Sequence, residues 1–187
     1  MNKRRVVITG LGIVSPVGNN VNDAWANIIN GVSGIAPITN IDTEIQAVKF
    51  GGAVKEFDVS QYLSPKEAKK MDIFIHYGMA AGIQAFEDSG IEVTDENAER
   101  IGVAIGAGIG GLTTIEKTAD LFREKGPKRI SPFFVPSSII NMVSGNMSIK
   151  FGLKGPNFAI VTACTTGTHN IGDASRIIEY GDADVMI

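Results

Sequence analysis

The sequence predicts an α/β fold in which helices cover a buried sheet, arranged as one domain over residues 1–187. Two observations carry this prediction. Short runs rich in valine, isoleucine and alanine alternate with longer segments whose apolar residues recur at helical spacing. The chain has 187 residues, of which 44% are hydrophobic, so it is long enough for one sizeable core and short for two domains.

Four of the apolar runs are predicted as strands. They cover residues 5–11, 101–107, 158–163 and 183–187. Each is short and has few polar residues, which is typical of strands that are buried on both faces of a sheet.

The helices are predicted from the residues at their ends. Ser64, Pro65 and Glu67 have the serine N-cap, first-turn proline and third-position glutamate of a helix start, and Gly90 closes the segment. We therefore expect one helix from Pro65 to residue 89. A second helix, over residues 23–30, is expected between Asn22 and Gly31.

Two further helices follow in the second half of the chain. Thr113 and Glu116 have the spacing of a capping box ahead of a helix that Gly126 ends. Ser137 opens a segment that ends at Gly152, in which apolar residues recur at helical spacing at positions 140, 143 and 147.

Composition and charge exclude several classes of function. The formal net charge is −3, which gives no reason to expect a nucleic acid or an anionic membrane as partner. No apolar run reaches the roughly 20 residues of a membrane span, and the start of the chain does not have the pattern of a signal peptide. The single cysteine cannot form an internal disulfide, so we expect a reducing, cytoplasmic setting.

Cys164 is that single cysteine, and it lies where a predicted strand gives way to a helix-like stretch. A cysteine in this place is exposed to the positive end of the helix dipole and to unpaired backbone N–H groups, which favour the thiolate and can hold an oxyanion. Cys164 is therefore a candidate nucleophile. The alternative is a small buried residue, because free cysteine is often buried.

Neither histidine is placed to assist Cys164. His76 lies within the predicted helix that ends before Gly90, and His169 is five residues after Cys164, roughly 140° around the following helix. We expect structural roles for both. A histidine partner for Cys164 is then not found in this chain.

Two glycine-rich stretches invite a nucleotide-binding interpretation, which the residues do not support. Residues 10–12 lack the third glycine of the dinucleotide fingerprint, and residues 106–111 lack an acidic residue at the end of a second strand. We expect these glycines to allow close approach of the backbone to another backbone or to a substrate.

Three lysines form a basic patch at the predicted helix start. Lys66, Lys69 and Lys70 lie at helical spacing on the first turns, where the helix dipole disfavours cations. One explanation is a solvated helix face. The other is a docking surface for an acidic protein or a phosphate-bearing group.

Together these residues resemble a known family. Residues 161–167, Val-Thr-Ala-Cys-Thr-Thr-Gly, are similar to the nucleophile motif of the elongating β-ketoacyl-[acyl-carrier-protein] synthases, the condensing enzymes of fatty-acid synthesis. Residues 4–18, 131–136, 169–174 and 181–186 also resemble this family, and are closest to its synthase II branch. The resemblance extends over the whole chain, which corresponds to the first half of such an enzyme.

The resemblance implies the N-terminal half of a duplicated thiolase-like fold with αβαβα layers, and a 3-oxoacyl-[acyl-carrier-protein] synthase II activity. Cys164 would accept an acyl group as a thioester, and malonyl-acyl-carrier protein would then be decarboxylated and condensed with it. The family carries its two catalytic histidines and a lysine in the second half. No metal and no cofactor is implied.

The resemblance also implies roles for further residues. Ile109 and Ala163 match positions that line the acyl pocket, and Ile109 would gate chain length. Phe134 matches a pocket residue contributed across a homodimer. The lysine patch matches the basic surface that receives acyl-carrier protein, which Lys128 and Arg129 would extend.

The chain ends at Ile187 within an apolar run, from which we expect a fragment that cannot complete condensation. Two alternatives remain open. One is another cysteine acyltransferase of thiolase-like fold that uses coenzyme A, against which the motif and the lysine patch argue. The other is a non-catalytic fragment that binds the carrier or dimerises.

Overall fold

A three-stranded parallel sheet lies at the centre of the molecule. The structure, a computed structural model, describes residues 4–187, so the first three residues of the predicted domain lie outside it. The strand order is β4-β3-β5, with Val103 opposite Asn157 and Ile101 opposite Val185. The strands are β3 (Ile101–Ala104), β4 (Asn157–Phe158) and β5 (Val185–Met186). This arrangement confirms the predicted α/β class.

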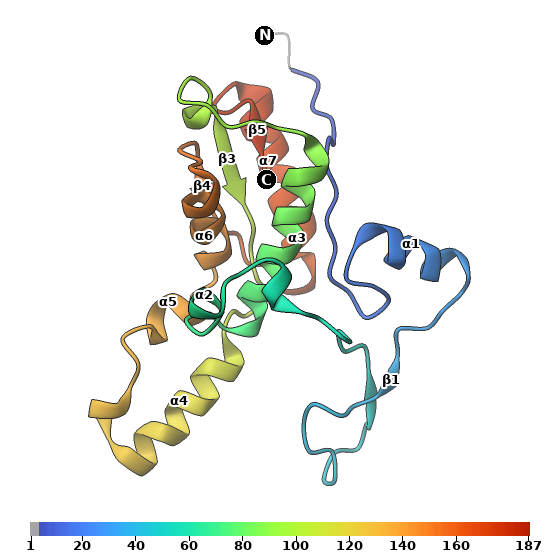
Figure 1. Cartoon of the computed structure of the whole chain (residues 1–187), viewed down its shortest axis with the longest axis vertical. Coiled ribbons are helices and arrows are strands. Elements are labelled where there is room, and N and C mark those ends of the chain that lie inside the picture. The colour runs from blue at the N-terminus through green and yellow to red at the C-terminus, as the bar shows by residue number, and fades with distance from the viewer. Residues whose placement is uncertain (1–3) are drawn as a thin grey trace.

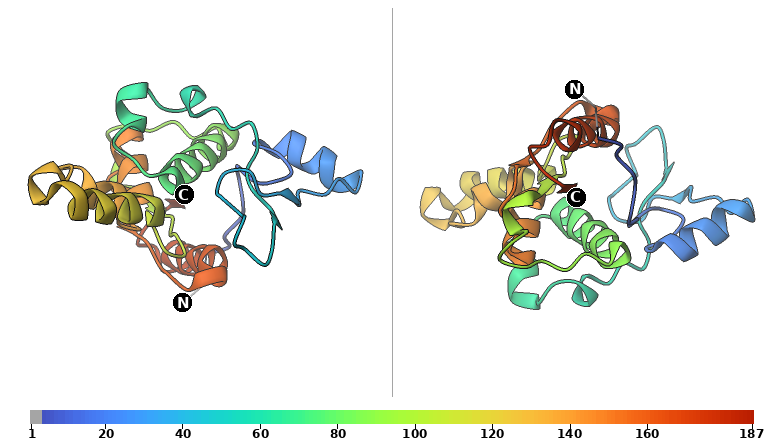
Figure 2. Two further views of the ribbon diagram at one scale, coloured as in Figure 1. Left: turned by 90° about the horizontal axis from the view of Figure 1, so that it is seen from below. Right: turned by 90° about the horizontal axis from the view of Figure 1, so that it is seen from above.

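Helices cover both faces of this sheet, as Figure 2 shows in the end-on views. Helices α3 (Ile73–Ser89) and α6 (Met142–Phe151) pack against each other on one face, and α7 (Thr166–Tyr180) covers the other. The core lies mainly between α3, α6 and β3. Its most buried side chains, all at 2% exposure or less, are Ile75, Met79, Ile101, Val103, Val143 and Met147.

The remaining elements extend from this centre (Figure 1). Helix α1 and the antiparallel pair β1–β2 lie on one side, and α4 and α5 project from the other. These elements are α1 (Val21–Ile29), β1 (Ala36–Pro37), β2 (Phe50–Gly51), α2 (Pro65–Ala68), α4 (Leu112–Lys125) and α5 (Phe134–Ser138), with 3₁₀ helices η1 (Val59–Gln61), η2 (Ala98–Arg100), η3 (Pro127–Arg129) and η4 (Ala163–Thr165). Within residues 4–187 no helix has the length and apolarity that a membrane crossing requires.

The predicted strand over residues 5–11 is wrong. The segment runs along α3, and the N–H groups of Leu11 and Ile13 donate to side chains of that helix instead of to a neighbouring strand. Gly12 lies so close to α3 that an added Cβ would be 1.9 Å from the carbonyl oxygen of Ala81, which confirms the expected role of this glycine. The other three predicted strands exist, but pairing covers only part of each.

The residues that end helices behave as predicted. Gly90, Gly126 and Gly152 all have positive φ angles directly after α3, α4 and α6. At the other end, Ser64 and Glu67 form the complete capping box of α2. The predicted cap of α1 was two residues off, because the side chain of Asn20 accepts from the N–H of Asp23.

Three other helix predictions are wrong. The helix expected to run unbroken from Pro65 stops at Ala68, and α3 begins again after Asp72, whose side chain caps it. Thr113 and Glu116 form no capping box, because α4 already begins at Leu112. Likewise, Ser137 lies in α5, and α6 begins only at Met142.

Candidate functional site

Cys164 lies in the short helix η4, directly before α7. Its thiol is free and exposed, so the alternative of a buried structural cysteine is wrong. The residue before it, Ala163, has a φ of 49°, a left-handed conformation that costs energy in a residue with a Cβ. Helix α7 begins at Thr166, so its first-turn N–H groups, which have no partner within that helix, lie beside the Cys164 turn.

Asn170 holds the segment that leads into this turn. Its side chain is 3% exposed and lies on α7, one and a half turns after Cys164. Its Oδ1 accepts from the N–H of Ile160 at 3.1 Å, and its Nδ2 lies 3.0 Å from the carbonyl oxygen of Ile160 and 2.7 Å from that of Thr166. A single buried amide therefore joins α7 to the residues that precede the cysteine.

Thr166 provides a second tie at the same place. Its hydroxyl oxygen accepts from the N–H of Thr162 at 3.0 Å, and Thr165 N–H donates to the carbonyl of Thr162 at 3.0 Å. The nucleophile candidate is thus exposed, while the backbone on both sides of it is held by hydrogen bonds that are mostly half-buried.

The pocket residues predicted from the resemblance come together in part. Ile109 and Phe134 line one apolar cavity of about 400 Å³, together with Ile115, Val135, Ser138, Ile139 and Ile140. Ala163 does not line this cavity, but it lies beside the same loop, because a Cβ added at Gly108 would be 3.6 Å from its carbonyl oxygen. The loop between β3 and α4 therefore contacts two parts of the site: Gly108 lies beside the turn that holds Cys164, and Ile109 lines the cavity.

The basic residues fall into two groups. Lys66 and Lys69 are exposed on and after α2, whereas Lys70 is half-buried with its Nζ 4.7 Å from the centre of the Phe133 ring. Lys128 and Arg129 are exposed in η3, which Figure 1 places at the outer end of α4, away from α2.

Both histidines have partners elsewhere. His76 Nε2 lies 2.9 Å from the carbonyl oxygen of Ala68, and His169 Nε2 lies 3.5 Å from a carboxylate oxygen of Asp173. These contacts agree with the structural roles expected for them. Among residues 4–187, no three histidine, cysteine, aspartate or glutamate side chains are grouped in a way that could hold a metal ion.

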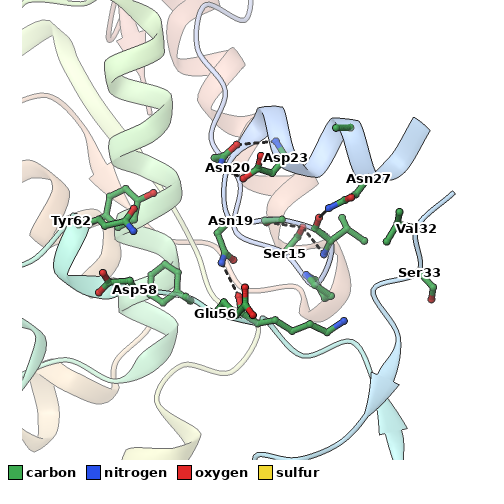
Figure 3. A pocket seen from close by; sticks show the side chains of 17 residues that line it. Ser15, Asn19, Asn20, Asp23, Asn27, Val32, Ser33, Glu56, Asp58 and Tyr62 are labelled. Atoms are coloured by element: carbon green, nitrogen blue, oxygen red, sulfur yellow. Dashed lines mark hydrogen bonds between the residues drawn. The ribbon is translucent and has the colours of Figure 1, made fainter. Parts of the chain in front are cut away.

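A second, larger cavity of about 550 Å³ lies between α1 and residues 55–62 (Figure 3). Polar side chains line much of it, among them Asn19, whose Nδ2 donates to the carbonyl of Lys55 at 2.8 Å. None of the predicted site residues lines this cavity. We therefore place the candidate site at Cys164 and the apolar cavity.

The sequence prediction missed Asn170 and Asp72, two buried polar residues that hold segments of this site. A signal for Asn170 exists, because an amide six residues after the candidate nucleophile sits within the first turns of the helix that follows it. Asp72 has the local position of a helix cap before α3, but nothing local indicates its second hydrogen-bond partner, Thr114.

Comparison with known proteins gives a family match over almost the whole chain. The family model described as "Beta-ketoacyl synthase, N-terminal domain" matches residues 3–187. The chain is 61% identical over 187 residues to a 3-oxoacyl-[acyl-carrier-protein] synthase 2 of Vibrio cholerae, and 54% identical to the protein of the same name from Coxiella burnetii. It covers 45% of each of these two proteins, so it spans about half the length of the curated relatives it matches.

Solved structures share the fold. The ishigamide ketosynthase/chain length factor is similar with a TM-score of 0.88 at 25% identity, over 98% of this chain and 46% of that one. A type II PKS ketosynthase in complex with its acyl-carrier protein is similar with a TM-score of 0.82 at 24% identity, over 98% of this chain and 50% of that one. The likeness confirms the thiolase-like ketosynthase fold expected for residues 4–187.

Proposed function

Since the chain belongs to the β-ketoacyl synthase family, as the N-terminal domain of such enzymes, we propose that it carries the acyl-accepting half of a 3-oxoacyl-[acyl-carrier-protein] synthase II. The observation that carries this proposal is the placement of Cys164. Its thiol is exposed in a strained turn at the start of α7, and the loop beside that turn leads directly into an apolar cavity at Ile109.

The chemistry assigned to Cys164 is thioester exchange. The thiolate attacks the carbonyl carbon of an acyl thioester on acyl-carrier protein, and N–H groups at the start of α7 stabilise the resulting oxyanion. The oxyanion collapses, the bond to the carrier's sulfur breaks, and that sulfur leaves as a thiolate that takes up a proton. The acyl group is then held on Cys164, with its hydrocarbon tail in the cavity that Ile109 lines.

The second step extends the chain by two carbons. Loss of carbon dioxide from malonyl-acyl-carrier protein leaves a carbanion equivalent, which attacks the Cys164 thioester and releases the cysteine thiolate. His76 and His169 are engaged with Ala68 and Asp173, so we assign the groups that support decarboxylation to the part of the relatives that this chain does not span. We expect no complete condensation from the 187 residues alone.

Charge and exposure support the proposed partners. Lys66 and Lys69 offer exposed positive charge to an acidic carrier protein, and Lys128 and Arg129 offer further exposed positive charge after α4. The rim of the cavity is apolar and exposed, with Ile109 at 70% and Val135 at 57%, which fits coverage by a second chain in a homodimer. A cytoplasmic location, where a free thiol stays reduced, completes the proposal.

Intact-mass spectrometry of the chain tests this function directly. Acyl-carrier protein loaded with a fatty acyl chain is incubated with the wild-type chain and with Cys164→Ser as the matched control. We expect one added acyl group on the wild type that hydroxylamine removes, and none on the control. A wild-type chain that stays unmodified, or an adduct that persists in Cys164→Ser, would refute the assignment.

A further inference from the structure

We propose that Asp72 is a positioning residue that holds the Ile109 loop and thereby influences the length of acyl chain that the cavity admits; the chain-length part rests on the function proposed above. Asp72 is 6% exposed, and it lies between the lysine patch and α3. It does not line the cavity, and it acts through the start of α4.

Asp72 caps two helices at once. Its Oδ1 accepts from the N–H of Phe74 at 3.3 Å in the first turn of α3. Its Oδ2 accepts from the N–H of Thr114 at 2.8 Å in the first turn of α4, which is 42 residues away in the sequence. One buried carboxylate therefore fixes the start of α4 relative to the core helix α3.

Helix α4 depends on this contact because its start lacks a side-chain cap of its own. Its own N-cap residue, Gly111, makes no side-chain hydrogen bond, and none of its residues is buried. A helix without a buried face gains little from packing, so its first turn depends mainly on its cap. Loss of the Asp72 contact should therefore loosen α4 locally and leave the core intact.

The same contact controls the cavity wall. Gly111 lies close to both Asp72 and α5: an added Cβ would lie 3.3 Å from Asp72 Cβ and 2.7 Å from Ser138 Cα. Its N–H donates to the carbonyl of Ser138 at 2.9 Å. Ile109 is two residues before Gly111 and Ile115 four residues after it, and both line the cavity. Movement at Gly111 must move Ile109.

Hydrogen exchange of the 187-residue chain tests the positioning without any need for activity. The change is Asp72→Asn, which keeps the size of the side chain but turns an NH₂ group toward one of the two N–H donors. Asp58→Asn is the matched control, because Asp58 caps η1 through the N–H of Ser60 at 2.9 Å and lines only the other cavity. We expect the backbone amides of residues 112–118 to exchange about fivefold faster in Asp72→Asn, and at the wild-type rate in Asp58→Asn. This is the change in the local opening equilibrium that loss of one helix cap produces.

Equal exchange rates in Asp72→Asn and wild type over residues 112–118 would overturn the positioning role. Faster exchange over the whole chain would overturn it as well, because it would show a general loss of stability instead of a local one.

Acylation of Cys164 tests the effect on chain length. The probes are hexanoyl and dodecanoyl thioesters of N-acetylcysteamine, and intact-mass spectrometry gives the two rates. When the loop of Ile109 is no longer held by Asp72, the cavity can admit a longer acyl tail. We therefore expect the ratio of the dodecanoyl to the hexanoyl acylation rate to rise about fivefold in Asp72→Asn and to stay at the wild-type value in Asp58→Asn. A general loss of folded protein lowers both rates together and leaves their ratio unchanged.

An unchanged or lower ratio in Asp72→Asn would overturn the chain-length role even if exchange is faster. If neither probe acylates the wild type, the proposed function of Cys164 fails as well as the chain-length role, while the hydrogen-exchange result still decides whether Asp72 positions α4.

Discussion

Replacement of Asn170 by alanine is the sharpest test of how the chain holds its nucleophile. The change removes three hydrogen bonds at 2.7–3.1 Å and leaves the N–H and the carbonyl of Ile160 without their partner. A buried polar group left unpaired costs about 1–3 kcal/mol. Ile160 is only half-buried, so water can partly replace the lost partner of its N–H and of its carbonyl. The cost of each unpaired group is therefore at the low end of this range. We expect the free energy of unfolding to fall by about 2–3 kcal/mol.

Urea denaturation of Asn170→Ala and of wild type measures this loss, with Asn146→Ala as the control. Asn146 donates a single hydrogen bond to the carbonyl of Met142 within its own helix. Loss of this bond should lower the free energy of unfolding by about 1 kcal/mol or less. Alkylation of Cys164 by iodoacetamide at pH 7 gives the second readout. We expect slower alkylation in Asn170→Ala, because the thiol no longer stays fixed at the start of α7, and the wild-type rate in Asn146→Ala.

A loss of stability in Asn170→Ala no greater than in Asn146→Ala would refute the reasoning about Ile160. Unchanged alkylation alongside the expected loss would refute the link from Asn170 to Cys164.

The other two predictions concern the packing of the N-terminal segment and its ion pairs. Gly12→Ala should lower the free energy of unfolding by more than about 2 kcal/mol, because the new methyl group would collide with the backbone of α3 at Ala81, and equal urea midpoints would contradict this. Arg100 and Arg4 hold the pKa of Asp184 well below its ordinary value of 3.8, so the stability that Asp184 contributes is present above pH 3.8 and is lost as the pH falls below it. Asp184→Asn should therefore be less stable than wild type at pH 7, with a gap that narrows by pH 3, and a gap independent of pH would refute this.

Signals that act within one turn of chain could be predicted from the sequence. Ser64 and Glu67 cap each other across three residues, and Gly90, Gly126 and Gly152 end helices because each adopts a positive φ that other residues avoid. The nucleophile candidate follows from the same kind of local evidence, since Cys164 lies at the end of a strand-like run and before a helix.

Features that depend on distant partners could not be predicted in this way. Residues 5–11 have the composition of a strand, but a strand needs a neighbour for its backbone N–H and C=O groups, and here Leu11 and Ile13 bond to side chains of α3. The break between α2 and α3 likewise depends on Asp72, whose bond to Thr114 joins residues that are 42 positions apart. The same bond explains why Thr113 caps nothing: α4 begins earlier, and its cap comes from another part of the chain.

The two sides of the candidate site are held in different ways, which bears on what the site can do. Ser144 on α6 is fully buried; its hydroxyl accepts from the N–H of Ile105 at 2.9 Å and lies 2.8 Å from the carbonyl oxygen of Phe158. Through this hydroxyl and through Asn170, the strand ends that lead to Cys164 are tied to the core.

The cavity wall is held to the core by Asp72, but few of its own residues are buried. Helix α4 buries no residue, and the only buried residues of α5 are Ser137 and Ser138. Segments with few buried apolar contacts open at low free-energy cost, so this wall can move while the nucleophile turn stays in place. Under the function proposed above, this division would let the reacting carbonyl meet Cys164 in one geometry whatever the space that the acyl tail requires.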